Sequence, residues 1–268
     1  MGQYQLGVIG SGTMAEVILR GALVANVIHH NTVIATDPRF PRRQLFTREL
    51  GVASVEDNKL AAACPYVLLA VKPQQMAEVL GGIADAVSPE TTIISIAAGV
   101  KTAFIRGRLG GKGRVVRVMP NTPLLAGAGV SALAAGEGAS ASDLDWPERL
   151  FGACGKTVRV EESSMDAVTA VSGSGPAYVF YLVEAMIEAG VAEGLDRDVA
   201  TELAVQTCVG AGRLLAKTGE TPQVLRARVT SPNGTTQAAI ESMDGAGVFE
   251  AVVAAVRRAA ERSRELGK

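Results

Sequence analysis

The spacing of apolar positions along the chain changes once, near residue 160. Up to that point, apolar runs of strand length alternate with segments whose apolar residues recur at helical spacing. This alternation is typical of a parallel sheet covered by helices on both faces. The expected strands are 6–9, 32–36, 66–70, 92–95, 115–119, 130–134 and 157–160, and the expected helices are 16–25, 42–50, 74–86, 102–109 and 142–151.

The remainder of the chain lacks strand-like runs and consists of helical segments rich in Ala, Leu, Val and Glu. Residues 176–183 are apolar on every face, so a helix there has to be buried all round. About 100 residues give such a helix little cover unless a second subunit supplies it. We therefore expect an intertwined dimer, with a self-contained bundle as the alternative. The other expected helices are 201–215, 225–229, 235–243 and 248–266.

A glycine-rich turn follows the first expected strand. Gly10 permits a tight turn, and Gly12 lets the backbone approach a pyrophosphate that the free N–H groups of the next helix would face. Ala15 stands at the third position of this GxGxxG-like pattern, where a small residue allows helix-on-strand packing. Asp37 ends the second expected strand at roughly the 20-residue spacing of a ribose-binding acid. The combination predicts a dinucleotide site, against a plain turn as the alternative.

Three further loops follow expected strands at the same edge of the sheet, where ligands of such sheets bind. They are Val71-Lys72-Pro73, Ala97-Ala98-Gly99 and Pro120-Asn121-Thr122-Pro123. Each of these segments alone is also compatible with an ordinary connecting loop. Together they favour a cofactor cleft.

Composition excludes several classes of partner. Lys and Arg number 26 against 27 Asp and Glu, with no basic stripe interleaved with aromatics, so we expect neither nucleic acid nor membrane as a partner. The three cysteines lack paired spacing, which argues against a disulfide framework and a zinc site. We expect buried thiols, no metal, and a cytoplasmic protein without a signal or membrane segment.

Histidine is nearly absent, because His29 and His30 are the only two and lie far from the candidate loops. Alcohol and carbonyl dehydrogenases usually move a proton on oxygen through a tuned His, Lys or Tyr. A protonated imine is already a cationic hydride acceptor and needs mainly binding, water exclusion and orientation. The sequence therefore favours an imine substrate.

A polar stretch over residues 229–237 opens an expected helix with free N–H groups, which suits a carboxylate. Ser231, Gly234, Thr235 and Thr236 supply hydroxyls and backbone access, and Asn233 tolerates left-handed geometry. An ordinary helix cap after a Pro-Asn-Gly turn is the alternative. Residues 172–176, which include Ser174 and Gly175, form another such turn at a helix start, which serves either a ligand or a neighbouring helix.

The whole chain resembles the pyrroline-5-carboxylate reductase family. Its most specific motif is residues 225–244, LRARVTSPNGTTQAAIESMD, supported by residues 70–73, 95–99, 119–123 and 172–178. The resemblance implies an α/β fold, with a Rossmann-type dinucleotide-binding domain over 1–161 and an all-helical dimerisation and substrate-binding domain over 162–268. It also implies a homodimer, often assembled into a decamer, and reduction of L-1-pyrroline-5-carboxylate to L-proline by NADPH or NADH.

The resemblance also implies roles for individual residues. Backbone groups of residues 234–236 would bind the substrate carboxylate beside Ser231, with Ser174 and Gly175 bordering the substrate, and the Thr236 hydroxyl would reach the ring nitrogen as the catalytic candidate. The cofactor-binding residues would be Gly10, Gly12, Thr13, Met14, Asp37, Arg39, Asn58, Ala70, Val71, Lys72, Pro73, Ala97, Gly99 and Asn121.

The choice between cofactors depends on opposing charges near residue 37. Asp37 favours NADH by binding a ribose hydroxyl, whereas Arg39, Arg42 and Arg43 could bind a 2′-phosphate and favour NADPH. We expect NADPH, which the family generally uses. Two other readings stay open: a hydroxyacid dehydrogenase of the same plan, with Lys72 or a helical-domain lysine moving the proton, and a non-catalytic NAD(P)-binding redox sensor.

Overall fold

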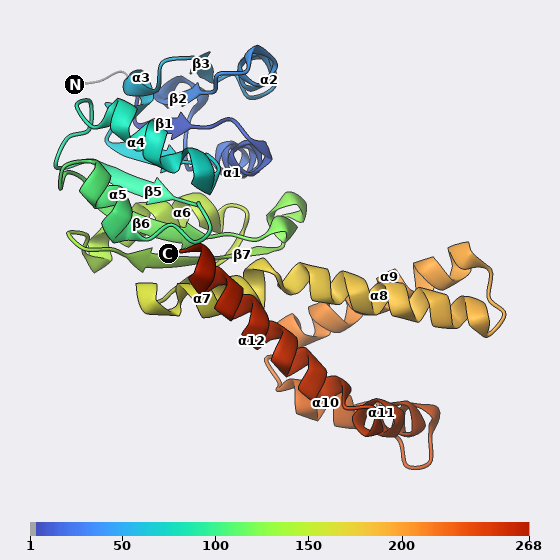
Figure 1. Cartoon of the computed structure of the whole chain (residues 1–268). Helices are drawn as coiled ribbons and strands as arrows, with labels where there is room; N and C mark the ends of the chain where they lie inside the picture. Colours follow the sequence, from blue (N-terminus) through green and yellow to red (C-terminus); the bar gives the residue numbers. More distant parts are fainter. Residues whose placement is uncertain (1–3, 268) are drawn as a thin grey trace. The chain divides into compact units, whose positions relative to one another are not determined.

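The computed structural model describes residues 4–267 and divides them into two compact units, residues up to Gly173 together with those from Ala259 on, and Ser174–Arg258. The first unit is built on one eight-stranded sheet of order β3-β2-β1-β4-β5-β6-β7-β8 (Figure 1). Its strands are β1 Leu6–Ile9, β2 Val33–Thr36, β3 Ala53–Val55, β4 Tyr66–Leu69, β5 Thr92–Ser95, β6 Arg114–Met119, β7 Gly129–Ala135 and β8 Gly155–Arg159.

The expectation of a parallel sheet is wrong at one place, because β7 pairs antiparallel with β6. The link between these strands, residues 120–128, holds only a short 3₁₀ segment that ends at Gly127 with φ 65°. A parallel crossover needs a dozen or more residues, usually with a helix. The short link therefore reverses the chain, and all other neighbouring strands are parallel.

Helices cover both faces of the sheet, as the alternating pattern predicts. Apolar residues of β1 alternate between two buried clusters. Leu6 and Val8 pack with the helices over residues 13–24 and 145–152, and Ile9 packs with those over residues 58–62, 76–83 and 102–108. Two short elements, β3 and α3, were not expected, since few apolar residues mark them. The helices of this unit are α1 Thr13–Val24, α2 Phe40–Leu50, α3 Asn58–Ala62, α4 Met76–Ile83, α5 Thr102–Arg108, α6 Asp145–Gly152 and α7 Met165–Val168.

The helices of the second unit include α8 (Gly175–Ala192) and α9 (Arg197–Thr218), which pack against each other along their length (Figure 1). Within the single chain α8 has no buried residue, and Phe180 and Tyr181 are 60% and 76% exposed. The chain alone therefore does not bury the apolar segment 176–183. The helices are α8 Gly175–Ala192, α9 Arg197–Thr218, α10 Pro222–Arg228, α11 Thr235–Gly245 and α12 Val248–Leu266.

The last turns of α12 belong to the first unit. Ser263, which is 5% exposed, donates a hydrogen bond of 2.6 Å from Oγ to Oδ1 of Asp166 in α7. Leu266 lies against Gly99, in the loop that follows β5. The chain end is thereby attached to the sheet unit. Over residues 4–267, no helix combines the length and apolarity needed to cross a membrane.

Candidate dinucleotide site and substrate loop

The glycine-rich turn has the geometry that its residues predict. Gly10 has φ 97°, and a Cβ there would lie 2.8 Å from the carbonyl oxygen of Ala70. A Cβ on Gly12 would meet no atom within 4 Å. Gly12 is the N-cap residue of α1 and has no side chain that could accept from the first N–H groups of the helix. No described residue accepts the N–H of Thr13 or Met14 at the start of that helix. This end of α1 is suited to an anionic group such as a pyrophosphate.

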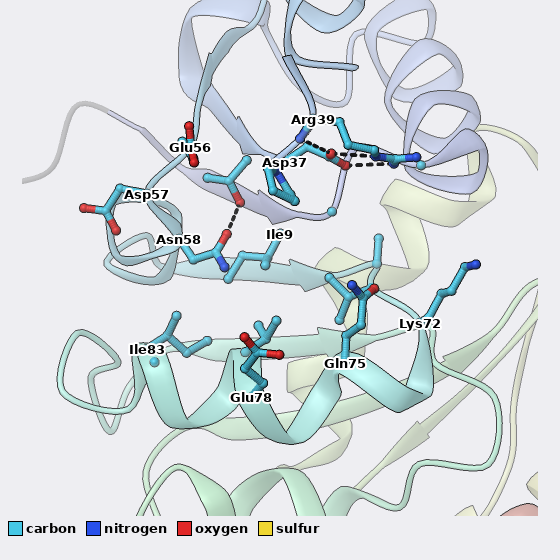
Figure 2. Close-up of a pocket in the computed structure, with 18 of the residues that line it drawn as sticks. Ile9, Asp37, Arg39, Glu56, Asp57, Asn58, Lys72, Gln75, Glu78 and Ile83 are labelled. Atoms are coloured by element: carbon cyan, nitrogen blue, oxygen red, sulfur yellow. Dashed lines mark hydrogen bonds and ion pairs between the residues drawn. The ribbon is translucent and has the colours of Figure 1, made fainter. Parts of the chain in front are cut away.

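Beside this turn lies a pocket of about 900 Å³ (Figure 2). It brings together eight of the predicted cofactor-binding residues: Gly10, Gly12, Asp37, Arg39, Asn58, Ala70, Val71 and Lys72. Six further polar residues that sequence reasoning missed line the pocket: Thr36, Glu56, Asp57, Lys59, Gln75 and Glu78. Glu56 follows the short strand β3, which the pattern does not reveal, and Gln75 and Glu78 belong to the turn and helix opposite Asp37.

Asn58 is held in place at the start of α3. Its Oδ1 accepts a hydrogen bond of 2.6 Å from Oγ1 of Thr36, the last residue of β2. This leaves the amide nitrogen of Asn58 as a donor toward the pocket that the residue lines. The preceding Asp57 caps the helix by accepting from the N–H of Lys59 at 2.9 Å.

Asp37 is 4% exposed and is bound on both oxygens. It accepts from the backbone N–H of Ser11 at 3.0 Å and from Arg39 through backbone and guanidinium donors. Burial by itself raises the pKa of the carboxyl, but the hydrogen bonds from Arg39 and Ser11 outweigh it and hold the pKa below its ordinary value. Asp37 is therefore ionised at neutral pH.

The other predicted cofactor-binding residues lie outside this pocket. Pro73 begins the 3₁₀ turn before α4, Ala97 and Gly99 are buried in the loop after β5, and Thr13 and Met14 open α1. Asn121 acts as a brace, because its Nδ2 donates to the backbone oxygen of Ser172 at 3.2 Å and its Oδ1 accepts from the N–H of Val130 at 2.9 Å.

The polar loop before α11 also has the expected backbone. Asn233 is left-handed, with φ 58°. A Cβ on Gly234 would lie 2.4 Å from Oγ of Ser231, so a larger residue here would displace the Ser231 hydroxyl. No described residue accepts the N–H of Thr235 or Thr236, and Gly234 provides no side-chain cap. These donors are open to a carboxylate.

Ser174 and Gly175 lie at the start of α8, directly after a π-helical turn over Thr169–Gly173. Such turns are rare and occur frequently at functional sites. A Cβ on Gly175 would meet no atom within 4 Å. The position is therefore accessible within its own unit.

The cysteines follow the sequence expectation in part. All three are free, and Cys64 and Cys154 are buried, but Cys208 is only partly buried. Its position on α9, a helix with few buried residues, explains the difference. Burial raises the pKa of the Cys64 thiol to about 11. Within residues 4–267, no group of His, Cys, Asp and Glu is arranged to hold a metal ion.

A doubly wound sheet with a glycine turn, an acid after β2 and a pocket beside both defines a dinucleotide-dependent oxidoreductase with a Rossmann-type domain. Residues 5–99 match the family model described as NADP oxidoreductase coenzyme F420-dependent, and residues 162–266 match that of pyrroline-5-carboxylate reductase dimerisation.

Full-length relatives identify the family. The chain is 40% identical over 269 residues to pyrroline-5-carboxylate reductase of Methanosarcina acetivorans and 42% over 275 residues to that of Pseudomonas aeruginosa, covering 100% of each chain. The solved structure of pyrroline-5-carboxylate reductase from Coxiella burnetii matches with a TM-score of 0.93 and 36% identity. The solved structure of pyrroline carboxylate reductase from Plasmodium falciparum, which has NADP bound, matches with a TM-score of 0.87 and 29% identity. Each match covers 100% of both chains. The chain belongs to the pyrroline-5-carboxylate reductase family.

Proposed function

We propose that the protein reduces the cyclic imine L-1-pyrroline-5-carboxylate to L-proline, with NADPH as the hydride donor. The observation that carries this proposal is the pocket beside the glycine turn, which gathers eight residues expected to bind a dinucleotide. The family relationship supports the substrate, and the Plasmodium falciparum structure with NADP bound supports the donor. A bound nicotinamide supplies the hydride.

The residues of the chain bind and orient the reactants. The free N–H groups of Thr235 and Thr236, at the start of α11, bind the substrate carboxylate, and Ser231 supports the turn beside them. The Thr236 hydroxyl donates to or orients the ring nitrogen, while Ser174 and Gly175 border the substrate. Because a protonated imine already accepts hydride, no histidine is required.

On the dinucleotide, the start of α1 binds the pyrophosphate through the N–H groups of Thr13 and Met14. Asn58 donates toward the adenine-side ribose. The loops after β4 and β5 line the nicotinamide half through Ala70, Val71, Lys72, Pro73, Ala97 and Gly99, with Asn121 shaping the floor.

We further propose that residues 162–268 form the interface of a homodimer, with a decamer as the larger assembly. The exposed apolar side chains of α8 and the match of residues 162–266 to a dimerisation model support the dimer. The free cysteines support a reducing, cytoplasmic location.

The test is the loss of nicotinamide absorbance with L-1-pyrroline-5-carboxylate, in parallel with NADPH and NADH, and with pyruvate as the control substrate. We expect rapid oxidation with the imine and none with pyruvate. Turnover of pyruvate would instead support a hydroxyacid dehydrogenase. Tight dinucleotide binding with no turnover of any cyclic imine would support the redox sensor.

A further inference from the structure

The loop after β5, residues 96–101, lies beside the loop that lines the cofactor pocket. β5 runs parallel to β4, and the N–H of Ile96 donates to the backbone oxygen of Leu69 at 3.2 Å. The loop after β4 lines the pocket through residues 70–72. The two loops therefore leave the sheet at the same edge, where ligands of such sheets bind.

The conformation of the loop after β5 depends on contacts from outside it. A hydrogen bond within the loop, from the N–H of Val100 to the backbone oxygen of Ala97, is long at 3.4 Å. Gly99 is buried and has φ 78°, a left-handed conformation. Two other segments of the sheet unit contact this loop or the helix start that follows it.

The last turn of α12 contacts the loop at Gly99. A Cβ on Gly99 would lie 3.5 Å from the backbone carbon and oxygen of Leu266. A Cβ on Gly267 would lie only 2.8 Å from the backbone oxygen of Gly99. Because that contact is with backbone, a side chain at Gly267 forces one of the two segments to move. The hydrogen bond from Ser263 to Asp166 fixes this turn on the sheet unit.

Glu162 fixes the other end of the loop. Its Oε1 accepts from the backbone N–H of Thr102, the first residue of α5, at 2.8 Å, and its Oε2 accepts from Oγ1 of Thr102 at 2.5 Å. Glu162 thus caps α5 from a distant part of the chain. Oε1 also lies 3.7 Å from Nη1 of Arg117, which is 5% exposed on β6.

One short segment provides the anchors on both sides. Glu162 begins the 3₁₀ turn Glu162–Ser164, and Asp166 lies in α7 four residues further on. The first carboxylate binds the start of α5, and the second binds the end of α12. The segment after β8 therefore ties the loop after β5 to the chain end.

We propose that Glu162 and the last turn of α12 position the loop after β5 against the nicotinamide half of the dinucleotide. Both act through the loop backbone, so they are positioning features. Hydride transfer requires the reacting atoms to be closely aligned, and a misplacement of about 1 Å can cost about 100-fold in rate. This inference rests on the dinucleotide binding proposed above, which assigns Ala97 and Gly99 to the nicotinamide half.

The first test is Gly267→Ala, which places a methyl group against the backbone of Gly99. We expect kcat with L-1-pyrroline-5-carboxylate to fall about fivefold or more and the nicotinamide fluorescence of bound NADPH to change. The affinity for 2′-phospho-ADP-ribose, which is NADPH without its nicotinamide, should stay within about twofold when measured by calorimetry. The matched control is Gly107→Ala on α5, where the added Cβ would meet no atom within 4 Å.

The second test separates positioning from stability at Glu162. Glu162→Ala should lower kcat about tenfold, with Glu161→Ala, at an exposed neighbouring position, as its control. Glu162→Gln keeps an oxygen for the N–H of Thr102 but removes the charge beside Arg117. Its urea midpoint should fall as in Glu162→Ala, whereas its kcat should stay within about threefold of the wild type. If Glu162 only stabilised the fold, kcat would follow stability in both variants.

Wild-type kcat and NADPH fluorescence in either Gly267→Ala or Glu162→Ala would overturn the inference. Equal weakening of NADPH and 2′-phospho-ADP-ribose would also overturn it, because the damage would then extend beyond the nicotinamide. Failure of the proposed reaction is a separate result, since the fluorescence is measured without the imine. A wild type that reduces no imine, together with variants whose NADPH fluorescence is changed, would refute only the proposed activity.

Discussion

The two compact units differ in how far they bury their apolar side chains. In the sheet unit, large residues such as Phe46 and Ile18 are fully buried between the sheet and its helices. In the helical unit Ser174–Arg258, only Ala200 and Ala204 are buried apolar residues, and large side chains along α8 and α9 stay exposed. The sheet unit is complete as one chain, whereas the helical unit has the surface of one half of an interface.

The difference shows that a chain can be stabilised by apolar packing between subunits as well as by packing within itself. Complete burial of a large apolar side chain contributes about 1.5–3 kcal/mol. The sheet unit obtains this energy from its own helices. We infer that the helical unit obtains it on assembly, so its folding and its association are coupled.

The largest expected effect concerns the core of the sheet unit. Phe46→Ala should lower the free energy of unfolding by about 3–5 kcal/mol, because it leaves a cavity in a packed cluster. Urea denaturation followed through Trp146 fluorescence measures it, since this single tryptophan is buried against Tyr66 in the same unit. The matched control, Phe40→Ala, changes a phenylalanine of the same helix that is 63% exposed and should cost below about 1 kcal/mol. Equal losses would contradict the contrast between buried and exposed positions.

The next effect concerns the exposed face of α8. Phe180→Glu should weaken subunit association at least 100-fold, about 2.7 kcal/mol, because a charge replaces an apolar side chain at the proposed interface. Light scattering across a concentration series measures the mass. The control is Val24→Glu, at a position on α1 that is 84% exposed, and it should leave the mass unchanged. A Phe180→Glu protein that associates like the wild type would place the interface elsewhere.

A smaller effect separates the roles of the two units in the reaction. Thr236→Ala should lower kcat about 10- to 100-fold, about 1.4–2.7 kcal/mol, and leave the dissociation constant of the dinucleotide within twofold. Steady-state kinetics and calorimetry give the two values. Thr230→Ala serves as the control, because its hydroxyl donates to the backbone oxygen of Arg226. Loss of dinucleotide affinity in Thr236→Ala would contradict its assignment to the substrate.

The smallest effect concerns the attachment of the chain end to the sheet unit. Ser263→Ala removes the donor to Asp166 and should lower the free energy of unfolding by about 1 kcal/mol. Urea denaturation followed through Trp146 measures this change too. Ser242→Ala, at an exposed position on α11, should cause no loss of stability. If both variants behave alike, the bond contributes nothing measurable.

Several features of the candidate site could be predicted from residue types alone. Gly10 and Asn233 have positive φ, as expected for glycine and asparagine, and Asp37 directly follows β2 beside the glycine turn. Glu56 and Glu78 could not be predicted as pocket residues, because the chain brings them there through the short strand β3 and the helix α4. Their local sequence carries no signal for that position.

The sequence by itself determined the order of the strands and helices other than β3 and α3, the glycine turn and the change to an all-helical region, because these depend on local periodicity and on backbone preferences of single residues. Only the tertiary structure decided the reversal at β7, the closure of Asp37 by Arg39 and the seat of the last turn of α12 on the sheet unit. The reversal depends on the short link between β6 and β7, and the closure of Asp37 depends on its hydrogen bonds with Arg39. The position of α12 depends on contacts between residues far apart in the chain. The hydrogen bonds and contacts exist only once the chain has folded, and the short link has its effect only when β7 pairs with β6.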